Sequence, residues 1–241
     1  MAEFFQSIGN WFNGIKADFV LNFIKDNRWR YLTDGLMNTL KITVFAALLG
    51  IVLGFIVAII RSTYEQTGRL KILNAICRVY LTVIRGTPAV IQLMITYYVI
   101  FASVDISKLL VAIIAFGVNS GAYVAEIVRS GIMSVEKGQT EAGRSLGLSY
   151  TSTMARIVMP QAFKNVLPAL ANEFITLLKE TSIAGYIALP DLAKGGDIIQ
   201  SLTYEPFLPL LAVAAIYLVI VMLLTYLVGK LERRLRKSDR R

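Results

Sequence analysis

The residues that could do chemistry in this chain are few, and most of the polar ones lie inside apolar stretches. The sequence has no histidine and a single cysteine, Cys77. The commonest general base and the commonest metal ligand are therefore missing, and no internal disulfide can form. We expect no catalytic residue and no metal site. The carboxylate, amide and hydroxyl groups that remain are suited to holding a polar guest by hydrogen bonds and ion pairs.

These polar side chains form two stripes at helical spacing. The first stripe comprises Asn119, Ser120, Tyr123, Glu126 and Ser130. The second comprises Asn172, Glu173, Thr176, Lys179 and Glu180. Ionisable groups are costly inside a membrane and usually face a cavity or a partner, so two such stripes predict a shared water-accessible path. The candidate path residues are Asn119, Ser120, Tyr123, Glu126, Thr176 and Glu180.

Some of these polar groups have a simpler alternative explanation. Glu126 and Arg129 are three residues apart on the expected helix, so they could pair with each other near its end. Glu173 could equally hold an interface between subunits. For these residues the sequence leaves both interpretations open.

The elements that would position the stripes are membrane-spanning helices. The chain has 241 residues, of which 56% are hydrophobic, and a mean hydropathy of +0.61, which excludes an ordinary soluble domain. A spanning helix needs about 20 mostly apolar residues. Four stretches meet this requirement, at 42–60, 86–104, 109–125 and 206–229. A fifth, at about 164–189, is interrupted by charges, but we include it because the orientation of the chain requires it.

The orientation follows from the basic residues. The segments 61–85 and 129–164 and the tail after 229 carry 17 lysines and arginines, whereas the two opposite loops carry only Lys108 and Lys194. Basic loops stay in the cytoplasm, so the C-terminus is expected inside and the N-terminus outside. Within the first basic segment, residues 70–84 are expected to form a helix along the cytoplasmic face.

Three regions follow from this pattern. Residues 1–34 form an N-terminal segment whose apolar side chains recur at helical spacing between 4 and 24. This spacing predicts an amphipathic helix in the outer membrane interface, or alternatively one that packs on another subunit. Residues 35–230 form the transmembrane domain, and residues 231–241 form a basic cytoplasmic tail.

A charged, glycine-punctuated segment, EAGRSLGLSYTSTMARIVMP, occupies residues 141–160. It resembles the EAA motif of the membrane subunits of ABC transporters, which reads E-A-A, three residues, Gly, nine residues, Ile, x, Leu-Pro. Gly143 stands for the second alanine and Met159 for the leucine. In that family the segment is a cytoplasmic coupling helix, here at about 138–150, that docks on the ATP-hydrolysing subunit. The resemblance assigns this role to Glu141, Ala142, Gly143, Gly147, Ile157 and Pro160.

Three further stretches, YLTVIRGTPAVIQL, NSGAYVAEIVRSGI and LKETSIAGYIAL, resemble the polar amino-acid branch of these importers, the His/Glu/Gln/Arg/opine type. The resemblance implies an all-α, polytopic protein with five transmembrane helices of the type I ABC importer permease fold, in addition to the N-terminal amphipathic helix. It implies a bacterial cell-membrane permease that imports a polar amino acid. In the path predicted from the polar stripes, Glu180 would face the ammonium group or a cationic side chain of the amino acid, while Asn119 and Ser120 would bond its carboxylate.

The resemblance also implies the partners. They are an ATPase dimer that binds ATP and Mg, a second permease copy or paralogue, and an extracytoplasmic amino-acid-binding protein, with no nucleic acid. This chain has no G-x-x-x-x-G-K-[ST] loop, so we expect it to bind no cofactor itself. The alternatives are an ATP-independent secondary transporter or channel, or the same importer class carrying cystine or an opine. An intramembrane serine hydrolase is disfavoured because the chain has no histidine that could serve as its general base.

Overall fold

The computed structural model describes residues 14–238, except for the side chains at positions 66 and 236–238. The prediction of an all-α fold is confirmed, since these residues form helices and connecting turns only. In chain order the helices are η1 (Val20–Ile24), η2 (Lys25–Asn27), α2 (Trp29–Thr67), α3 (Lys71–Gly86), α4 (Ala89–Ile95), η3 (Thr96–Ile100), α5 (Lys108–Met133), α6 (Lys137–Ser145), α7 (Tyr150–Thr153), η4 (Met154–Val158), α8 (Met159–Glu180), η5 (Thr181–Ile187), α9 (Leu192–Thr203) and α10 (Phe207–Ser238).

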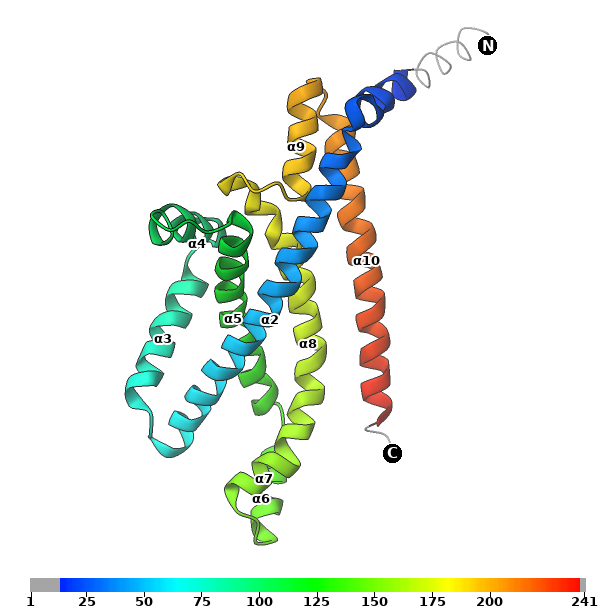
Figure 1. Cartoon of the computed structure of the whole chain (residues 1–241). Helices are drawn as coiled ribbons and strands as arrows, with labels where there is room; N and C mark the ends of the chain where they lie inside the picture. Colours follow the sequence, from blue (N-terminus) through cyan, green and yellow to red (C-terminus); the bar gives the residue numbers. More distant parts are fainter. Residues whose placement is uncertain (1–13, 239–241) are drawn as a thin grey trace.

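The centre of the bundle is the crossing of α2 and α5 (Figure 1). The two helices approach closely because glycines face the crossing. A Cβ atom at Gly50 would lie 3.0 Å from the Cβ of Ser120, and one at Gly54 would overlap Val124. Small residues allow such close approach of helices in a membrane, where packing replaces the hydrophobic effect as the main attraction. The crossing therefore fixes the position of α5, which carries the first polar stripe.

Three helices are long and apolar enough to cross a membrane on their own: α2, α5 and α10. They coincide with three of the predicted spans. α8 packs on α5 in the same bundle, although Glu173, Lys179 and Glu180 interrupt its apolar sequence. α10 packs on α8 and α9, but only 11% of its most apolar stretch is buried. This exposed face is suited to contact with lipid or with another subunit.

The predicted second span at 86–104 does not form one long helix. The stretch forms α4 and η3, 12 residues that would extend about 18 Å as a helix, which is too short to cross a membrane. The helix that runs beside α2 and α5 is instead α3, which we expected on the cytoplasmic face (Figure 1). Hydropathy missed α3 because Arg78 and Arg85 lie within it and lower its average.

α3 and α4 meet at a corner of 112°. The corner has a local cause, because Thr87 is extended (φ −126°) and Pro88 has no backbone N–H to continue the helix. α4 begins at Ala89, directly after Pro88. Thr87 does not cap α4; its hydroxyl donates to the Val83 carbonyl.

The Gln92 amide group holds the corner. Its Nε2 lies 2.8 Å from the Ile84 carbonyl, 3.0 Å from the Thr87 carbonyl and 2.8 Å from the Thr87 hydroxyl. Its Oε1 accepts a hydrogen bond of 2.9 Å from Asn119 Nδ2 of α5. The carbonyl groups that the helix break leaves unpaired are therefore satisfied from α4, and the corner is tied to α5.

At the other junction of the bundle, α9 packs on α2 and α10. Asp191 caps α9, with its Oδ1 accepting from the Lys194 backbone N–H at 3.0 Å. The Asp191 side chain is fully buried, and burial raises the pKa of its carboxyl group from 3.8 to about 6. Its Oδ2 is buried without a hydrogen-bond partner among the described residues.

The N-terminal segment is described from residue 14 onward. The predicted amphipathic residues Phe4, Ile8, Trp11 and Phe12 lie outside the described residues. Of the others, Phe19 is exposed and Phe23 is buried in a cluster with Leu32 and Leu192. α2 begins at Trp29, so its first residues lie inside the segment expected to end at 34.

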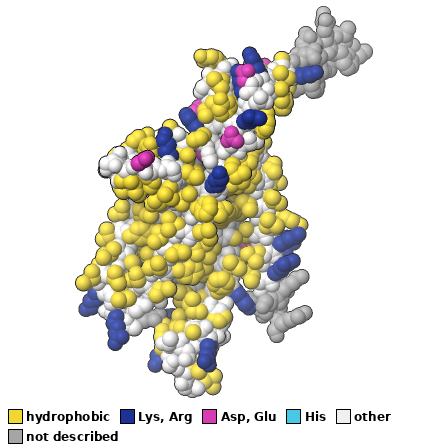
Figure 2. Space-filling view, in the orientation of Figure 1, with side chains coloured by type: hydrophobic (Ala, Val, Ile, Leu, Met, Phe, Trp, Pro, Cys, Tyr) yellow, Lys and Arg dark blue, Asp and Glu magenta, His cyan; other side chains and the backbone are white. Residues whose placement is uncertain are grey.

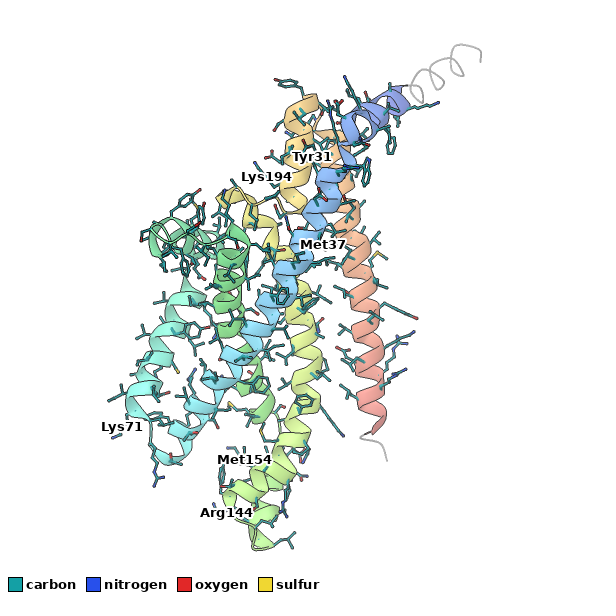
Figure 3. All side chains as sticks on the ribbon, viewed as in Figure 1. Tyr31, Met37, Lys71, Arg144, Met154 and Lys194 are labelled. Carbon is teal, nitrogen blue, oxygen red and sulfur yellow. The ribbon has the colours of Figure 1, made fainter. Side chains whose placement is uncertain are left out.

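The charges separate toward the two ends of the molecule. Figure 2 shows an apolar belt between the two ends, with Lys and Arg at both ends and the visible acidic side chains at the upper end. Figure 3 places Lys71 and Arg144 at one end and Tyr31 and Lys194 at the other. Lys71 and Arg144, which belong to two basic segments that the sequence assigned to one side, therefore lie at the same end of the bundle.

Candidate functional site

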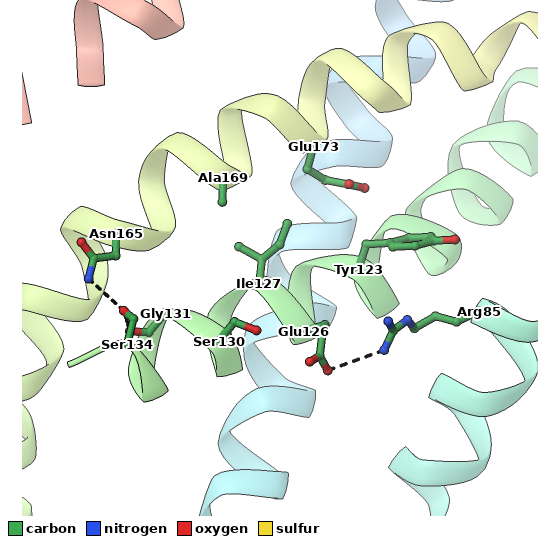
Figure 4. A pocket seen from close by; sticks show the side chains of 10 residues that line it. All are labelled: Arg85, Tyr123, Glu126, Ile127, Ser130, Gly131, Ser134, Asn165, Ala169 and Glu173. Carbon is green, nitrogen blue, oxygen red and sulfur yellow. Dashed lines mark hydrogen bonds and ion pairs between the residues drawn. The ribbon is translucent and has the colours of Figure 1, made fainter. Parts of the chain in front are cut away.

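A cavity of about 490 Å³ lies between α3, α5 and α8. Figure 4 shows the side chains that line it. The polar ones are Arg85 of α3, Tyr123, Glu126 and Ser130 of α5, Ser134 directly after α5, and Asn165 and Glu173 of α8. Two carboxylates and a guanidinium thus converge on one space within an otherwise apolar bundle. Such a space can hold a small polar molecule that carries both signs of charge.

Glu126 forms the charged floor of this cavity. Its Oε1 lies 2.6 Å from Arg129 Nη2, which confirms the pairing that their spacing predicted. Its Oε2 also lies 3.6 Å from Arg85 Nη1, across the gap between α5 and α3. The first contact is a short charge-assisted hydrogen bond, and the second is a longer ion pair. One carboxylate is therefore shared by two arginines, and Arg85 is the more weakly held.

Glu173 enters the cavity from α8. The Ser120 hydroxyl donates a hydrogen bond of 2.8 Å to Glu173 Oε1, which fixes the carboxylate between α8 and α5. Figure 4 shows its carboxylate and that of Glu126 on the walls of the same space, on different helices. A group with several hydrogen-bond donors, such as an ammonium, could therefore contact both carboxylates at once.

Two of the predicted path residues support the cavity from behind. Asn119 and Ser120 are almost fully buried, at 2% and 1% exposure. Asn119 bonds to Gln92 at the corner, and Ser120 bonds to Glu173. They face neighbouring helices, and neither of them lines the cavity wall. Asn119 therefore holds α4 in place, and Ser120 holds the Glu173 carboxylate.

Two further predicted path residues, on α8, lie outside the cavity. Thr176 and Glu180 follow Glu173 by three and seven residues on α8, so they are about one and two turns further along. The Thr176 hydroxyl donates to the Asn172 carbonyl of its own helix at 3.2 Å. The structure thus brings Tyr123 and Glu126 together with Glu173 and separates them from Glu180.

Sequence reasoning did not include Arg85 or Glu173 among the candidates. Glu173 lies on the same polar arc as Glu180, so the helical wheel alone could not rank the two. Arg85 precedes the Gly86-Thr87-Pro88 break, and it was assigned to a loop because the break was taken as the start of a span. The helix that ends at this break is what directs Arg85 toward Glu126.

The motif segment 141–160 forms a compact hairpin of α6, α7 and η4 that projects from the end of the bundle (Figure 1). Gly143 is the buried contact of α6. A Cβ atom there would lie 2.7 Å from Thr153 Cγ2 and 3.0 Å from Ile157 Cδ1. This explains why glycine stands where the motif has alanine. Ile157 thus packs inside the hairpin, and Pro160 lies in the first turn of α8.

The turn after α6 depends on a second glycine. Gly147 has φ +82°, a conformation that favours glycine. Its N–H donates to the Arg144 carbonyl, and the Leu148 N–H donates to the Gly143 carbonyl at 3.1 Å. The turn leaves Glu141 and Ala142 exposed, together with Leu146, whose exposure of 82% is high for a large apolar side chain. An apolar residue displayed at such a tip is suited to insertion into a partner.

Most of the chain matches one family model and is similar to permease proteins of known transport systems. Residues 50–237 match the model of the family described as binding-protein-dependent transport system inner membrane component. The arginine transport system permease protein ArtQ of Bacillus subtilis (strain 168) is 38% identical over 212 residues, covering 87% of this chain and 94% of that protein. The glutamine transport system permease protein GlnP of Escherichia coli (strain K12) is 34% identical over 199 residues, covering 81% and 90%.

The L-cystine transport system permease protein TcyB of Bacillus subtilis (strain 168) is 35% identical over 216 residues, covering 89% of this chain and 90% of that protein. A crystal structure of an amino acid ABC transporter with histidines has a TM-score of 0.81 and 39% identity, covering 88% of this chain and 98% of that chain. Both the sequence and the fold are shared over nearly the full length of these relatives. The chain therefore belongs to the family of inner membrane components of binding-protein-dependent transport systems.

Proposed function

We propose that this protein is the permease subunit of an ABC importer that carries a polar amino acid through the cavity between α3, α5 and α8. The observation that carries the proposal is the convergence of Glu126, Glu173 and Arg85 on one space of about 490 Å³. An amino acid brings an ammonium and a carboxylate, and each must keep a partner inside a membrane. The relatives named for arginine, glutamine and cystine transport support this substrate class.

The residues have distinct roles in this proposal. Glu173 and Glu126 receive the ammonium, and Arg85, which holds Glu126 only at 3.6 Å, turns to the carboxylate. Tyr123 shapes the wall, while Asn119 and Ser120 position Gln92 and Glu173. Thr176 and Glu180 continue the path along α8 beyond the cavity.

The hairpin of α6, α7 and η4 is the dock for the ATPase. Glu141, Ala142 and Leu146 form its exposed surface, while Gly143 and Ile157 fix its inside and Gly147 its turn. The partner ATPase binds ATP and Mg, and its closure moves the hairpin together with α8, because η4 runs directly into α8 at Met159. Alternating access then follows as a two-state rearrangement of packed helices.

The chain crosses the membrane five times, through α2, the bent pair of α3 with α4 and η3, α5, α8 and α10. With α3 in the second span, Arg78 and Arg85 leave the loop count, and 15 basic residues remain on the cytoplasmic side against Lys108 and Lys194 outside. The N-terminus lies outside and the C-terminus in the cytoplasm. Two such permeases, identical or paralogous, assemble with two ATPase subunits and receive the amino acid from an extracytoplasmic binding protein.

Uptake in proteoliposomes tests the function. The full transporter should be reconstituted with its ATPase and a saturating binding protein, and uptake of labelled arginine, glutamine and cystine measured with and without ATP. ATP-dependent uptake of one of these is expected. Uptake that continues without ATP or without the ATPase would favour a secondary transporter or channel instead.

The orientation has its own test. Cysteines at Gly138, where a side chain meets open space, and at exposed Asp105 should be introduced after replacing Cys77 by Ala. An impermeant thiol reagent added to intact cells should label position 105 and leave position 138 unlabelled until the membrane is opened. Labelling of both positions from the same side would contradict the five-span orientation.

A further inference from the structure

A second cavity, of about 540 Å³, lies on the other side of Arg85, between α2 and α3. Three arginines line it: Arg61 of α2, and Arg78 and Arg85 of α3. The remaining lining residues, Leu81, Thr82 and Gly86, carry no charge. Arg85 also lines the cavity proposed for the amino acid, so the two spaces share one wall. One cavity is therefore rich in carboxylates and its neighbour in guanidinium groups.

The three arginines have few counter-charges among residues 14–238. Arg61 lies 3.7 Å from Glu65, which is half exposed, and Arg85 shares Glu126 with the closer Arg129. No carboxylate within 4.0 Å of Arg78 is found in the described part of the chain. Its guanidinium lies instead over the Tyr64 ring, 5.9 Å from the ring centre. Positive charge is therefore in excess at this cavity.

The donors of these arginines are not all satisfied. The Nε of Arg61 is buried without a hydrogen-bond acceptor among the described residues. A buried donor on a charged group costs free energy when it has no acceptor. The cost remains even if the end of the side chain reaches water, because the Nε atom itself stays buried. On α3, Arg78 and Arg85 are seven residues apart, with Thr82 between them, so all three lie on one face of the helix. That face and Arg61 together present more donors to the cavity than the neighbouring carboxylates satisfy.

We infer that this cavity binds an oxyanion, a carboxylate or a phosphate group. Guanidinium groups from two helices match the paired oxygens of such a group, and the bonds are charge-assisted. The inference does not depend on the amino-acid path, because it rests on Arg61 and Arg78, which the path does not use. Two sources have this chemistry: the headgroup of an anionic lipid, and the carboxylate of an amino acid that reaches Arg85 from the adjoining cavity.

The site itself is tested with inorganic phosphate. The full chain, purified in a neutral detergent without its ATPase, should be titrated with phosphate at constant ionic strength, and the unfolding temperature followed. We expect phosphate to raise it in the wild type, and Arg78→Gln to weaken the apparent affinity about tenfold, the size of one charge-assisted hydrogen bond. Arg61→Gln should act in the same direction.

Arg69→Gln is the matched control. Arg69 is exposed in the turn between α2 and α3, does not line the cavity, and loses the same charge. If phosphate stabilises Arg78→Gln as strongly as Arg69→Gln, the oxyanion site does not exist. Because Arg78 is exposed, its replacement should leave the fold intact, and folding is checked by the unfolding temperature without phosphate.

Two further measurements identify the source. If the ligand is a lipid headgroup, dioctanoyl phosphatidylglycerol should raise the unfolding temperature of the wild type more than dioctanoyl phosphatidylcholine does, and Arg78→Gln should lose this difference. The variant should keep the wild-type KM for uptake in phosphatidylcholine proteoliposomes. If it is the substrate carboxylate, the KM should rise and the lipid preference remain. An effect on phosphate alone would assign the site to a free anion. Normal uptake with no phosphate effect would overturn the site and leave the proposed function standing.

Discussion

In the hairpin of α6, α7 and η4, the residues that matter are those with the least side chain: Gly143 touches Thr153 and Ile157, and Gly147 makes the turn. In the cavity between α3, α5 and α8, they are the residues with a charge, Glu126, Glu173 and Arg85. The hairpin depends on shape and the cavity on electrostatics. A substitution that preserves shape and removes charge should therefore spare the first and disable the second, and one that adds bulk should do the reverse.

The largest effect is expected from Gly147→Asp in the hairpin. It places a side chain at φ +82° and a new charge at the surface proposed to meet the ATPase. We expect uptake and substrate-stimulated ATP hydrolysis to be lost while membrane insertion is retained. Gly68→Asp is the control, because Gly68 also has a positive φ of 66° and open space around it, but lies in the turn between α2 and α3. Equal losses in both variants would remove the special role of the hairpin.

The next effect is expected from Glu173→Gln in the cavity. The glutamine keeps the shape and can still accept the hydrogen bond from Ser120, so the fold should be preserved. Loss of the charge should lower uptake by about tenfold, the value of one charge-assisted hydrogen bond. Glu180→Gln, two turns further along α8, should have a smaller effect. The reverse order, in kinetics measured with a saturating binding protein, would move the site toward Glu180.

A smaller effect should follow from Gly143→Ala, which restores the alanine of the motif. The added methyl group meets Thr153 Cγ2, and overpacking of this kind costs about 1–3 kcal/mol. We expect the rate of ATP hydrolysis coupled to transport to fall a few-fold, because this overpacking strains the proposed dock. Thr153→Ser removes Cγ2 and keeps the hydroxyl that bonds the Ser149 carbonyl. The double variant should recover; if it does not, shape at this contact is not the reason for glycine.

The smallest effect on transport is expected at Asp191, a buried charge remote from both regions. Its carboxyl pKa of about 6 lies above 3.8, so the folded state holds a proton more tightly than the unfolded chain. Stability from this group is complete below about pH 4 and is lost as the pH rises through 6, by at most about 3 kcal/mol. Asp191→Asn, which keeps a residue suited to capping α9, should raise the unfolding temperature at pH 7.5 and leave it unchanged near pH 4.

The unfolding temperature of the full chain in detergent, measured from pH 4 to pH 8, checks this expectation. Uptake should stay near the wild-type value. A large loss of uptake would mean that sensitivity to charge is not special to the cavity. An unchanged unfolding temperature at pH 7.5 would mean that the Asp191 carboxylate is already compensated when the protein is folded.

The sequence predicted those features that local pattern determines. α2, α5 and α10 are continuous apolar stretches, and the motif at 141–160 has fixed spacing, so each could be found without knowledge of its neighbours. Helical spacing also offered the pair of Glu126 and Arg129 as one of two interpretations, and the structure contains it. The all-α fold follows from the same local signals, because each span is long enough to be recognised individually.

Features that depend on two distant segments were not predicted. The helix α3 was predicted, but along the cytoplasmic face. Its place beside α2 and α5 was missed because its arginines lower its hydropathy. Glu173 and Glu180 share one face of α8, and only the position of Ser120 on α5 distinguishes them. Gly143 could be read as a conservative departure from the motif, but its cause, Thr153, becomes visible only when the hairpin is folded.

The corner between α3 and α4 has a mechanical consequence. A break at Gly86, Thr87 and Pro88 would normally act as a joint, since unpaired carbonyl groups leave it free to bend. Here the Gln92 side chain, from α4, donates hydrogen bonds to the Ile84 and Thr87 carbonyls on the other side of the break, and it accepts one from Asn119 of α5. The corner therefore behaves as a rigid bracket. When α5 shifts, α3 must travel with it, and Arg78 and Arg85 are displaced together rather than one at a time.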